Sequence, residues 1–306
     1  MSKRIQRRLA KRKRRIENRL KPRQWPEQDE PMFQAANIHY EMSDRARGLS
    51  CGGIGAMHLV ARQTGLIDAI DRNVHVLKRH LPYHESDHVL NIAYNILSGG
   101  TCLEDLELLR NNEAYLNALG APRSPDPTTA GDFCRRFTVE DIEALTDAIN
   151  AVRLKVWSQQ DAGFFEQAII EADGTLAETT GECKEGMDIS YKGQWGYHPL
   201  VVSLANTGEP LYLVNRSGNR PSHEGAADRF DQALALCRQA GFRRILFRGD
   251  TDFTQSGRLD GWDDQGAAFL FGIDARANLV TRAEGLSEAC WRPLERPAKY
   301  TVQTEP

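Results

Sequence analysis

The amino-acid sequence predicts an α+β or α/β protein in which a helical N-terminal domain precedes a domain built on a mixed β-sheet. Apolar residues recur at helical spacing from about residue 53 to residue 160. After residue 163 the pattern changes to short apolar runs rich in β-forming residues, separated by glycine-containing turns and by one further helical segment. The 306 residues, of which 41% are hydrophobic, are enough for one large domain or two ordinary ones.

The first 50 residues are a basic arm and a polar connector. Residues 1–25 contain twelve Lys and Arg, among them Arg12, Arg14 and Arg15, against one acid, so this segment carries +11 while the whole chain carries −3. Because each cation placed on a phosphate releases a condensed counterion, such a segment favours a polyanion. We expect these arginines to contact DNA; the alternative is a solvated tail that keeps the protein soluble.

Residues 51–162 are predicted to form the helical domain. The expected helices cover residues 57–70, residues 89–97 before Gly99 and Gly100, a segment with Thr101 and Glu104 as a capping box, and a long stretch from 133 to 156. A bundle of this size can present a helix to a DNA groove, and we assign it to DNA binding. Plain packing is the alternative role for each helix taken alone.

Residues 163–306 are predicted to form the sheet domain. The expected order is strand 164–171, strand 195–205, a turn at 206–210, strand 211–216, helix 222–240 with Ser222 as its cap, strand 244–250 and strand 267–274. Three antiparallel strands leading into a β–α–β crossover open an RNase H-like fold. The hairpin argues against a doubly wound Rossmann sheet, as does the lack of a G-x-G-x-x-G fingerprint.

Two aspartates stand where strands of this sheet end. Asp173 follows the first predicted strand and Asp250 the fourth, with Asp252 as a near alternative. In an RNase H-like sheet these strands are neighbours, so both carboxylates emerge at one edge and invite a hard divalent cation, Mg²⁺ or Mn²⁺. Such ions activate the attacking oxygen and stabilise the leaving oxygen in phosphodiester chemistry. The alternative for each aspartate alone is a turn former.

A resemblance to a known family rests on long motifs. The stretch ADGTLAETTGECKEGMDISYKGQWGYHPLVVSLANTGEPLYLVNRSGNRPSHEGAADRF, with RILFRGDTDF after it and SPDPTTAGDFCRRF in the helical part, resembles bacterial insertion-sequence transposases of the DDE type, group 1. The resemblance implies an RNase H-like catalytic domain, Mg²⁺ dependence, and cutting and joining of DNA at element ends. By this resemblance, Asp173 corresponds to the first catalytic, metal-binding acid and Asp250 to the second. A homo-oligomer on DNA is left open.

The third acid departs from the family pattern. In such transposases a Glu on a later helix completes the triad, and the chain stops about where an insertion before that helix begins. We therefore expect the catalytic domain to be incomplete at the C-terminus and inactive alone, and strand 267–274 to be partly exposed. Two alternatives follow: a DNA-binding remnant that does not cleave, and an RNase H-like nuclease that uses Glu284 or Glu288 as its third acid.

Further residues near the proposed edge are candidates for DNA contact. Lys192, Arg216 and Arg220 can hold phosphates, and Trp195 can stack on an unpaired base. The equally simple alternative is that these residues only form a strand edge and a polar loop and do not contact DNA. His198 is expected to be a packed strand residue.

The sequence shows no sign of a membrane or secreted protein. No apolar run reaches the roughly 18 residues of a membrane span, and no apolar segment follows the basic N-terminus as in a secretory signal. The six cysteines lack metal-ligand spacing, so we expect reduced thiols and no zinc. We predict a cytoplasmic protein.

Overall fold

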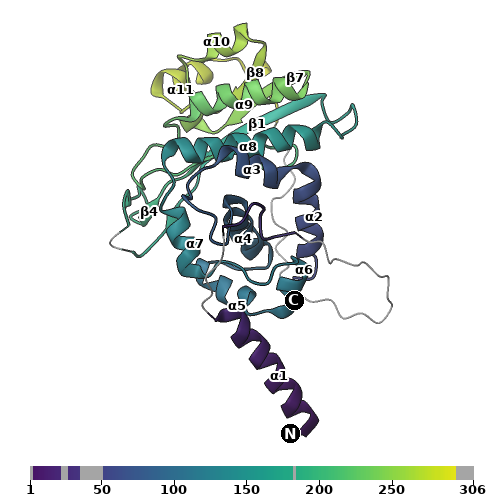
Figure 1. Cartoon of the computed structure of the whole chain (residues 1–306). Coiled ribbons are helices and arrows are strands. Elements are labelled where there is room, and N and C mark those ends of the chain that lie inside the picture. The colour runs from purple at the N-terminus through teal and green to yellow at the C-terminus, as the bar shows by residue number, and fades with distance from the viewer. Residues whose placement is uncertain (1–2, 22–26, 35–50, 182–183, 294–306) are drawn as a thin grey trace, which may run out of the picture. The chain divides into compact units, whose positions relative to one another are not determined.

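The computed structural model describes residues 3–21, 27–34, 51–181 and 184–293 (Figure 1). Its internal contacts divide the chain into two compact units. The first consists of Met1–Glu166 and Ala235–Arg243, and the second of Gln167–Leu234 and Arg244–Pro306. Most of the predicted connector, residues 22–26 and 35–50, lies outside the described residues. No helix in the described part of the chain is long and apolar enough to cross a membrane.

The basic arm forms helix α1 (Lys3–Leu20). The side chains of Arg12, Arg14 and Arg15 are exposed on this helix. Arg15 Nε lies 2.9 Å from Oε1 of Glu113, the first residue of α6 (Glu113–Ala118). An ion pair of this kind contributes little to stability. The other predicted DNA contacts on this helix, Arg12 and Arg14, face solvent.

The helices of the first unit are arranged about α4 (Glu85–Leu97), which contacts α3, α5 and α7 (Figure 1). The helices are α2 (Ile54–Thr64), α3 (Leu66–Asn73), α5 (Leu106–Arg110) after the 3-10 turn η1 (Leu103–Asp105), α6, α7 (Pro127–Cys134) and α8 (Val139–Trp157). The core between them includes Ile70, Tyr94, Leu116 and Leu119, each at most 3% exposed. The predicted helical domain therefore has a buried core of its own.

Two of the predicted helices are each divided in the structure. Gly65 adopts a left-handed conformation with φ 78°, which ends α2 and precedes α3, so the helix predicted over 57–70 is wrong as a single element. The stretch predicted from 133 to 156 also breaks after Cys134. Thr138 starts α8 there through a capping box with Asp141, whose Oδ2 lies 2.9 Å from Thr138 N.

The capping box predicted for Thr101 and Glu104 is wrong. Oδ2 of Asp105 accepts hydrogen bonds from Thr101 N at 2.7 Å and from Cys102 N at 3.2 Å. The acid that binds these donors is thus the neighbour of Glu104, and the chain forms the short turn η1 before α5 begins. Spacing alone did not show which of two adjacent acids reaches the free N–H groups.

A buried carboxylate holds an early segment of the chain against α4. Asp87 is fully buried, and its oxygens accept hydrogen bonds from Met32 N at 2.9 Å, Phe33 N at 3.0 Å and His84 N at 3.0 Å. Burial nevertheless raises the pKa of Asp87 to about 6, because the loss of water around the carboxylate outweighs these three bonds.

The stability of the protein relative to an Asp87→Asn variant is expected to depend on pH. The pKa of Asp87 is about 6 in the folded chain and lower when unfolded, so protonation favours folding and this advantage is lost as the pH rises. Between about pH 4 and pH 7 the free energy of unfolding, wild type minus variant, should fall by roughly 2 kcal/mol. Urea titrations of both proteins measure it, and a difference that grows with pH would contradict the assignment.

The second unit contains a five-stranded mixed sheet of order β6-β5-β1-β7-β8. Its strands are β1 (Gln167–Gly174), β5 (Leu200–Leu204), β6 (Glu209–Val214), β7 (Arg244–Gly249) and β8 (Ala267–Phe271). β5 runs antiparallel to β1 and β6, whereas β7 and β8 run parallel to β1, with helix α9 (Ala226–Ala240) in the crossover from β6 to β7. The predicted RNase H-like fold, including its hairpin at residues 206–210, is confirmed.

Aromatic side chains form the core on one face of this sheet. The ring of Phe230 on α9 lies 4.7 Å from Phe247 on β7 and 5.6 Å from Trp262 on α10 (Leu259–Asp264). Trp262 is buried, and its Nε1 donates a hydrogen bond to Asp231 Oδ1 at 2.7 Å. Because the one polar atom of this indole has a partner, α9 and α10 pack here without an unsatisfied donor.

Helix α9 begins later than the sequence predicts. Its first residue is Ala226, and the predicted cap Ser222 lies in a preceding turn. The carbonyls of Pro221, Ser222 and Glu224 accept hydrogen bonds from Arg216 Nη1, at 3.1, 3.0 and 2.7 Å. These acceptors are therefore directed toward a side chain, and the segment forms turns.

A small second sheet was missed by the sequence analysis. It has the order β2-β4-β3 and consists of β2 (Ala177–Glu178), β3 (Asp188–Ile189) and β4 (Trp195–Tyr197). The single strand predicted over 195–205 is wrong, because β4 and β5 belong to different sheets. Pro199 lies between them, and proline has no N–H group to donate to a strand ladder.

Strand β8 forms one edge of the main sheet and is largely exposed. It ends at Phe271, three residues before the predicted end, and Leu270 is 61% exposed. The predicted exposure of this strand is confirmed. The helix α11 (Ala277–Glu284) and the 3-10 turn η3 (Glu288–Cys290) follow it along the chain.

Candidate active site

Asp173 and Asp250 occupy equivalent positions on neighbouring parallel strands. β1 and β7 pair in register up to Glu171 and Arg248, and each aspartate lies two residues beyond this last pair. Paired strands are about 4.8 Å apart, and residues at the same register point to the same face. Both carboxylates therefore emerge at one edge of the sheet.

A cavity of about 710 Å³ opens at this edge. Its acidic lining residues are Asp173, Asp250 and Asp252, and its basic ones are Lys192 and Arg220. The rest of the lining comes from Gly174–Leu176, Tyr191, Gln194, His198 and the loop Gly218–Ser222. Carboxylates that attract a cation and cations that attract a phosphate thus share one open cavity.

The three carboxylates differ in what they bind. Asp250 Oδ1 accepts a hydrogen bond from Asp252 N at 2.9 Å and so caps the 3-10 turn η2 (Thr251–Phe253). No hydrogen bond reaches the side chain of Asp173 within the described part of the chain. All three residues are exposed. The carboxylates of Asp173 and Asp252 and the second oxygen of Asp250 are therefore open to a ligand in the described part of the chain.

Two glycines allow close packing beside these acids. A Cβ on Gly174 would lie 2.5 Å from His198 Nε2, and a Cβ on Gly272 would lie 2.9 Å from Thr251 Cγ2. Gly174 thus lets the His198 ring pack against the end of β1, and Gly272 lets the chain after β8 lie against the turn that follows Asp250. This close packing explains why the residue after Asp173 in the A-D-G-T motif is a glycine, which has no Cβ.

His198 is a buried histidine beside the acids. It is 3% exposed, and its Nδ1 donates a hydrogen bond to Arg220 O at 2.8 Å. Because a carbonyl can only accept, Nδ1 is the donor in this bond. The sequence analysis placed His198 near the proposed edge as a packed strand histidine, and in the structure it lines the cavity because Gly174 approaches its ring closely.

Arg216, one of the predicted DNA contacts, is directed into the protein. Its Nε donates to His198 O at 2.9 Å, and its Nη1 donates to the three carbonyls of the turn before α9. Burial lowers the pKa of Arg216. These hydrogen bonds fix the loop that carries Arg220. Arg216 is therefore not among the proposed DNA contacts.

The other predicted contacts remain directed outward. Lys192 Nζ lies 5.4 Å from the centre of the Tyr191 ring, and Arg220 Nη1 lies 3.3 Å from Glu224 Oε1. Trp195 is 57% exposed and lines a neighbouring cavity with Glu178 and Met187 rather than the one that holds the acids. Arg12, Arg14 and Arg15 belong to α1 in the first unit.

The donor set fits a magnesium ion that is completed by substrate. Within the described residues, no three His, Cys, Asp or Glu side chains are gathered closely enough to hold a metal, and neither Glu284 nor Glu288 lines the cavity. Mg²⁺ is, however, usually bound through one or two carboxylates together with waters and substrate phosphates. Asp173 and Asp250 supply two such carboxylates at one edge.

No curated protein matches the chain. Among solved structures, a cryo-EM structure of a piggyBac transposase synaptic complex with hairpin DNA is similar at 10% identity and a TM-score of 0.32. The match covers 83% of this chain and 48% of that one, so the chain spans about half the length of that transposase. Residues 43–305 match the family model described as transposase DDE domain group 1. The chain belongs to this transposase family.

Proposed function

We propose that this protein is the DNA transposase of an insertion sequence and that it cuts and joins DNA at the ends of the element by metal-dependent phosphoryl transfer. The observation that carries the proposal is that Asp173 and Asp250 each lie two residues beyond the last pair of β1 and β7 and line one cavity. Membership of the DDE transposase family supports it. The proposed place of action is the cytoplasm, and the proposed partners are element ends, target DNA and further copies of the chain.

Asp173 and Asp250 would hold Mg²⁺, or Mn²⁺ in its place. When bound, the ion lowers the pKa of an attacking water or hydroxyl and stabilises charge on the leaving oxygen. Lys192 and Arg220, on the same cavity, bind the phosphates beside the scissile bond and set its direction relative to the acids. His198 holds the backbone of Arg220, so it keeps one of these cations in place.

Two alternative functions predict different outcomes when the protein is mixed with DNA. A DNA-binding remnant that does not cleave is favoured by one observation: in the described part of the chain no three His, Cys, Asp or Glu side chains form a group that could hold a metal, although Asp252 lines the same cavity as Asp173 and Asp250. A nuclease that uses Glu284 or Glu288 has less support, because neither residue lines the cavity.

The proposal is tested with the protein expressed from its complete reading frame and DNA that carries the ends of its element. We expect Mg²⁺-dependent cleavage at those ends, followed by strand joining to a target, both resolved on denaturing gels. Binding without cleavage would support the remnant. Cleavage of any DNA without joining, lost on Glu284→Gln or Glu288→Gln, would support the nuclease.

A further inference from the structure

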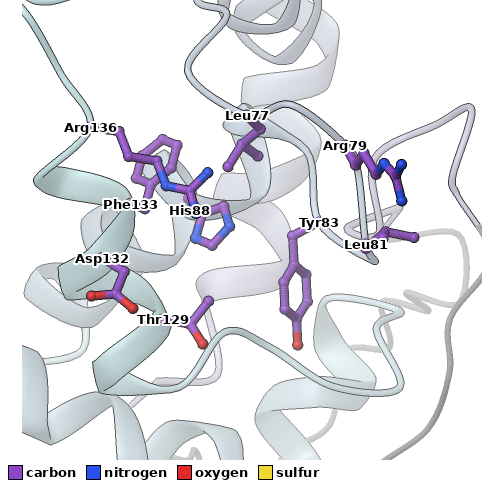
Figure 2. A pocket seen from close by; sticks show the side chains of 9 residues that line it. All are labelled: Leu77, Arg79, Leu81, Tyr83, His88, Thr129, Asp132, Phe133 and Arg136. Atoms are coloured by element: carbon purple, nitrogen blue, oxygen red, sulfur yellow. The ribbon is translucent and has the colours of Figure 1, made fainter.

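The aromatic residues that line cavities in the two units differ in whether a ligand can reach them. In the first unit, a cavity of about 290 Å³ is lined by Tyr83, His88 and Phe133 (Figure 2). These side chains are 7, 3 and 2% exposed, and Phe133 stacks on the His88 ring with 4.4 Å between the ring centres, so the rings are closed to a ligand. In the second unit, Trp195 on the central strand β4 of the small sheet is 57% exposed. Its side chain is open to a ligand.

Trp195 lines a cavity of about 580 Å³, the Trp195 cavity, together with Met187. Ile189 on β3 pairs directly with Trp195, and residues paired in this way point to the same face of a sheet. Ile189 is 48% exposed. Exposed apolar side chains that gather on two short strands indicate a surface that binds something.

One turn joins the Trp195 cavity to the cavity lined by the catalytic acids, which we call the acid cavity. Gln194 lines both cavities. The turn connects β3 to β4 and is closed by hydrogen bonds from Ser190 N to Gln194 O at 2.7 Å and from Gly193 N to Ser190 O at 2.8 Å. Lys192 lies within this turn and lines the acid cavity, three residues before Trp195. The hairpin therefore presents a cation to one cavity and an indole ring to the next.

The two cavities differ in the ligand that their lining suits. Lys192 and Arg220 bring two cations to the acid cavity, where they can bind phosphates. The lining of the Trp195 cavity is mostly uncharged: beside Trp195 and Met187 it consists of Thr179, Thr180, Gly193 and Gln194, with Glu178 as its charged residue. Lys184 lies nearby and donates a hydrogen bond to the Thr179 hydroxyl. An uncharged group with an aromatic face and polar edges fits such a lining, which describes a nucleic-acid base.

We propose that the Trp195 cavity receives one unpaired base of the DNA strand whose phosphates lie on Lys192 and Arg220, and that this base stacks on the indole of Trp195. Aromatic side chains stack on every base, because each base has a π-face. A cavity of 580 Å³ has room for one base that has left the duplex and not for a stacked pair of strands.

This inference rests on the proposed function in taking DNA as the ligand of the acid cavity. It assigns a task to the small sheet β2-β4-β3, which holds a base out of the duplex next to the bond that is cut. The acids Asp173 and Asp250 keep the chemistry, and Trp195 is a binding residue that lies outside their cavity.

The test compares the affinity of the full chain for a short duplex and for the same duplex with one unpaired nucleotide, without divalent metal. The ratio of the two affinities is the measured quantity, because the phosphate contacts of the basic helix α1 contribute to both. Trp195→Ala removes the ring and Trp195→Phe keeps an aromatic ring. Trp291→Ala is the matched control, since Trp291 is a 59% exposed tryptophan of the same unit that does not line either cavity.

We expect the wild type to prefer the DNA with the unpaired nucleotide about tenfold and Trp195→Ala to lose this preference. Trp195→Phe should keep most of it, and Trp291→Ala should keep all of it. The melting temperature of Trp195→Ala should stay close to that of the wild type, because an exposed side chain contributes little to stability. With 5-iodouracil as the unpaired base, ultraviolet light should crosslink the DNA to Trp195, which mass spectrometry of the peptides identifies.

Equal affinity of the wild type for both DNAs, or an unchanged preference in Trp195→Ala, would overturn the proposal. If Trp195→Ala instead changed the oligomeric state of the protein and left the preference intact, the exposed face would be a protein interface and the proposal would be wrong. If Trp195→Ala failed to fold, the crosslink in the wild type would decide, and a crosslink to a residue outside the Trp195 cavity would overturn the proposal.

These outcomes are distinct from failure of the proposed function, which is read from metal-dependent cleavage. A protein that never cleaves DNA but prefers an unpaired nucleotide through Trp195 would refute the transposase chemistry and support this site. A protein that cleaves element ends without this preference would do the reverse.

Discussion

Replacing Asp173 by asparagine is expected to reduce DNA cleavage by about a thousandfold or more and to leave DNA binding in place. Asparagine keeps the size of the side chain but removes the charge that holds a divalent ion at the end of β1. Metal stabilisation of the developing charge contributes several kcal/mol, and each 1.36 kcal/mol corresponds to a tenfold change in rate. Cleavage is measured on element-end DNA with the protein expressed from its complete reading frame, and binding by gel shift.

Asp250→Asn should have a comparable effect, because Asp250 follows β7 directly and lies, like Asp173, two residues beyond the last pair of β1 and β7. Asp252→Asn should reduce DNA cleavage less, since Asp252 donates its backbone N–H to Asp250 and lies within the turn η2. Asp260→Asn is the matched control: this aspartate is exposed on α10 in the same unit and does not line the cavity. Undiminished cleavage by Asp173→Asn would remove these acids from the mechanism.

The second large effect is expected on the salt dependence of DNA binding. Six exposed cations of α1 other than Arg15, which pairs with Glu113, can be replaced by glutamine, which also favours a helix: Arg7, Arg8, Lys11, Arg12, Lys13 and Arg14. Each phosphate contact contributes about 0.9 to the slope of log K against log salt concentration, so the slope should fall by up to about five. At low salt the affinity should drop more than about a hundredfold.

A second set of substitutions serves as the control for this experiment. Changing Arg7, Arg8, Arg12 and Arg14 to lysine preserves the charge of α1, so the salt slope should stay close to that of the wild type. The loss in the glutamine variant should be the same for every DNA sequence, because phosphate contacts carry no base information. If both variants keep the wild-type slope, the basic helix serves solubility and the DNA contact lies elsewhere.

The parts of the fold that are local in sequence could be predicted. The hairpin between β5 and β6 depends on the turn that contains Gly208, whose φ of 72° suits glycine, and on the apolar runs that flank it. The positions of Asp173 and Asp250 at the strand ends follow from the same runs. The order of strands then follows from the hairpin and from the two crossovers, one through α9 and one through α10.

The parts that depend on contacts across the chain could not be predicted. The strands β2, β3 and β4 have two or three residues each and too few alternating side chains to show a period. Arg216 has the composition of a phosphate contact, yet only the folded loop shows that it donates to carbonyls. The stacking of the His88 ring on Phe133 likewise cannot be predicted until α4 and α7 are packed together.

Metal binding by Asp173 and Asp250 is the central claim, and titration with Mn²⁺ followed by electron paramagnetic resonance tests it most directly. The signal of free Mn²⁺ is lost on binding, so the affinity can be measured with element-end DNA present and independently of cleavage. We expect the Asp173→Asn/Asp250→Asn variant to bind Mn²⁺ at least about tenfold more weakly than the wild type, because both carboxylate ligands are gone. An Asp260→Asn/Asp263→Asn variant should bind like the wild type. Equal Mn²⁺ affinity for the wild type and the Asp173→Asn/Asp250→Asn variant would contradict the account.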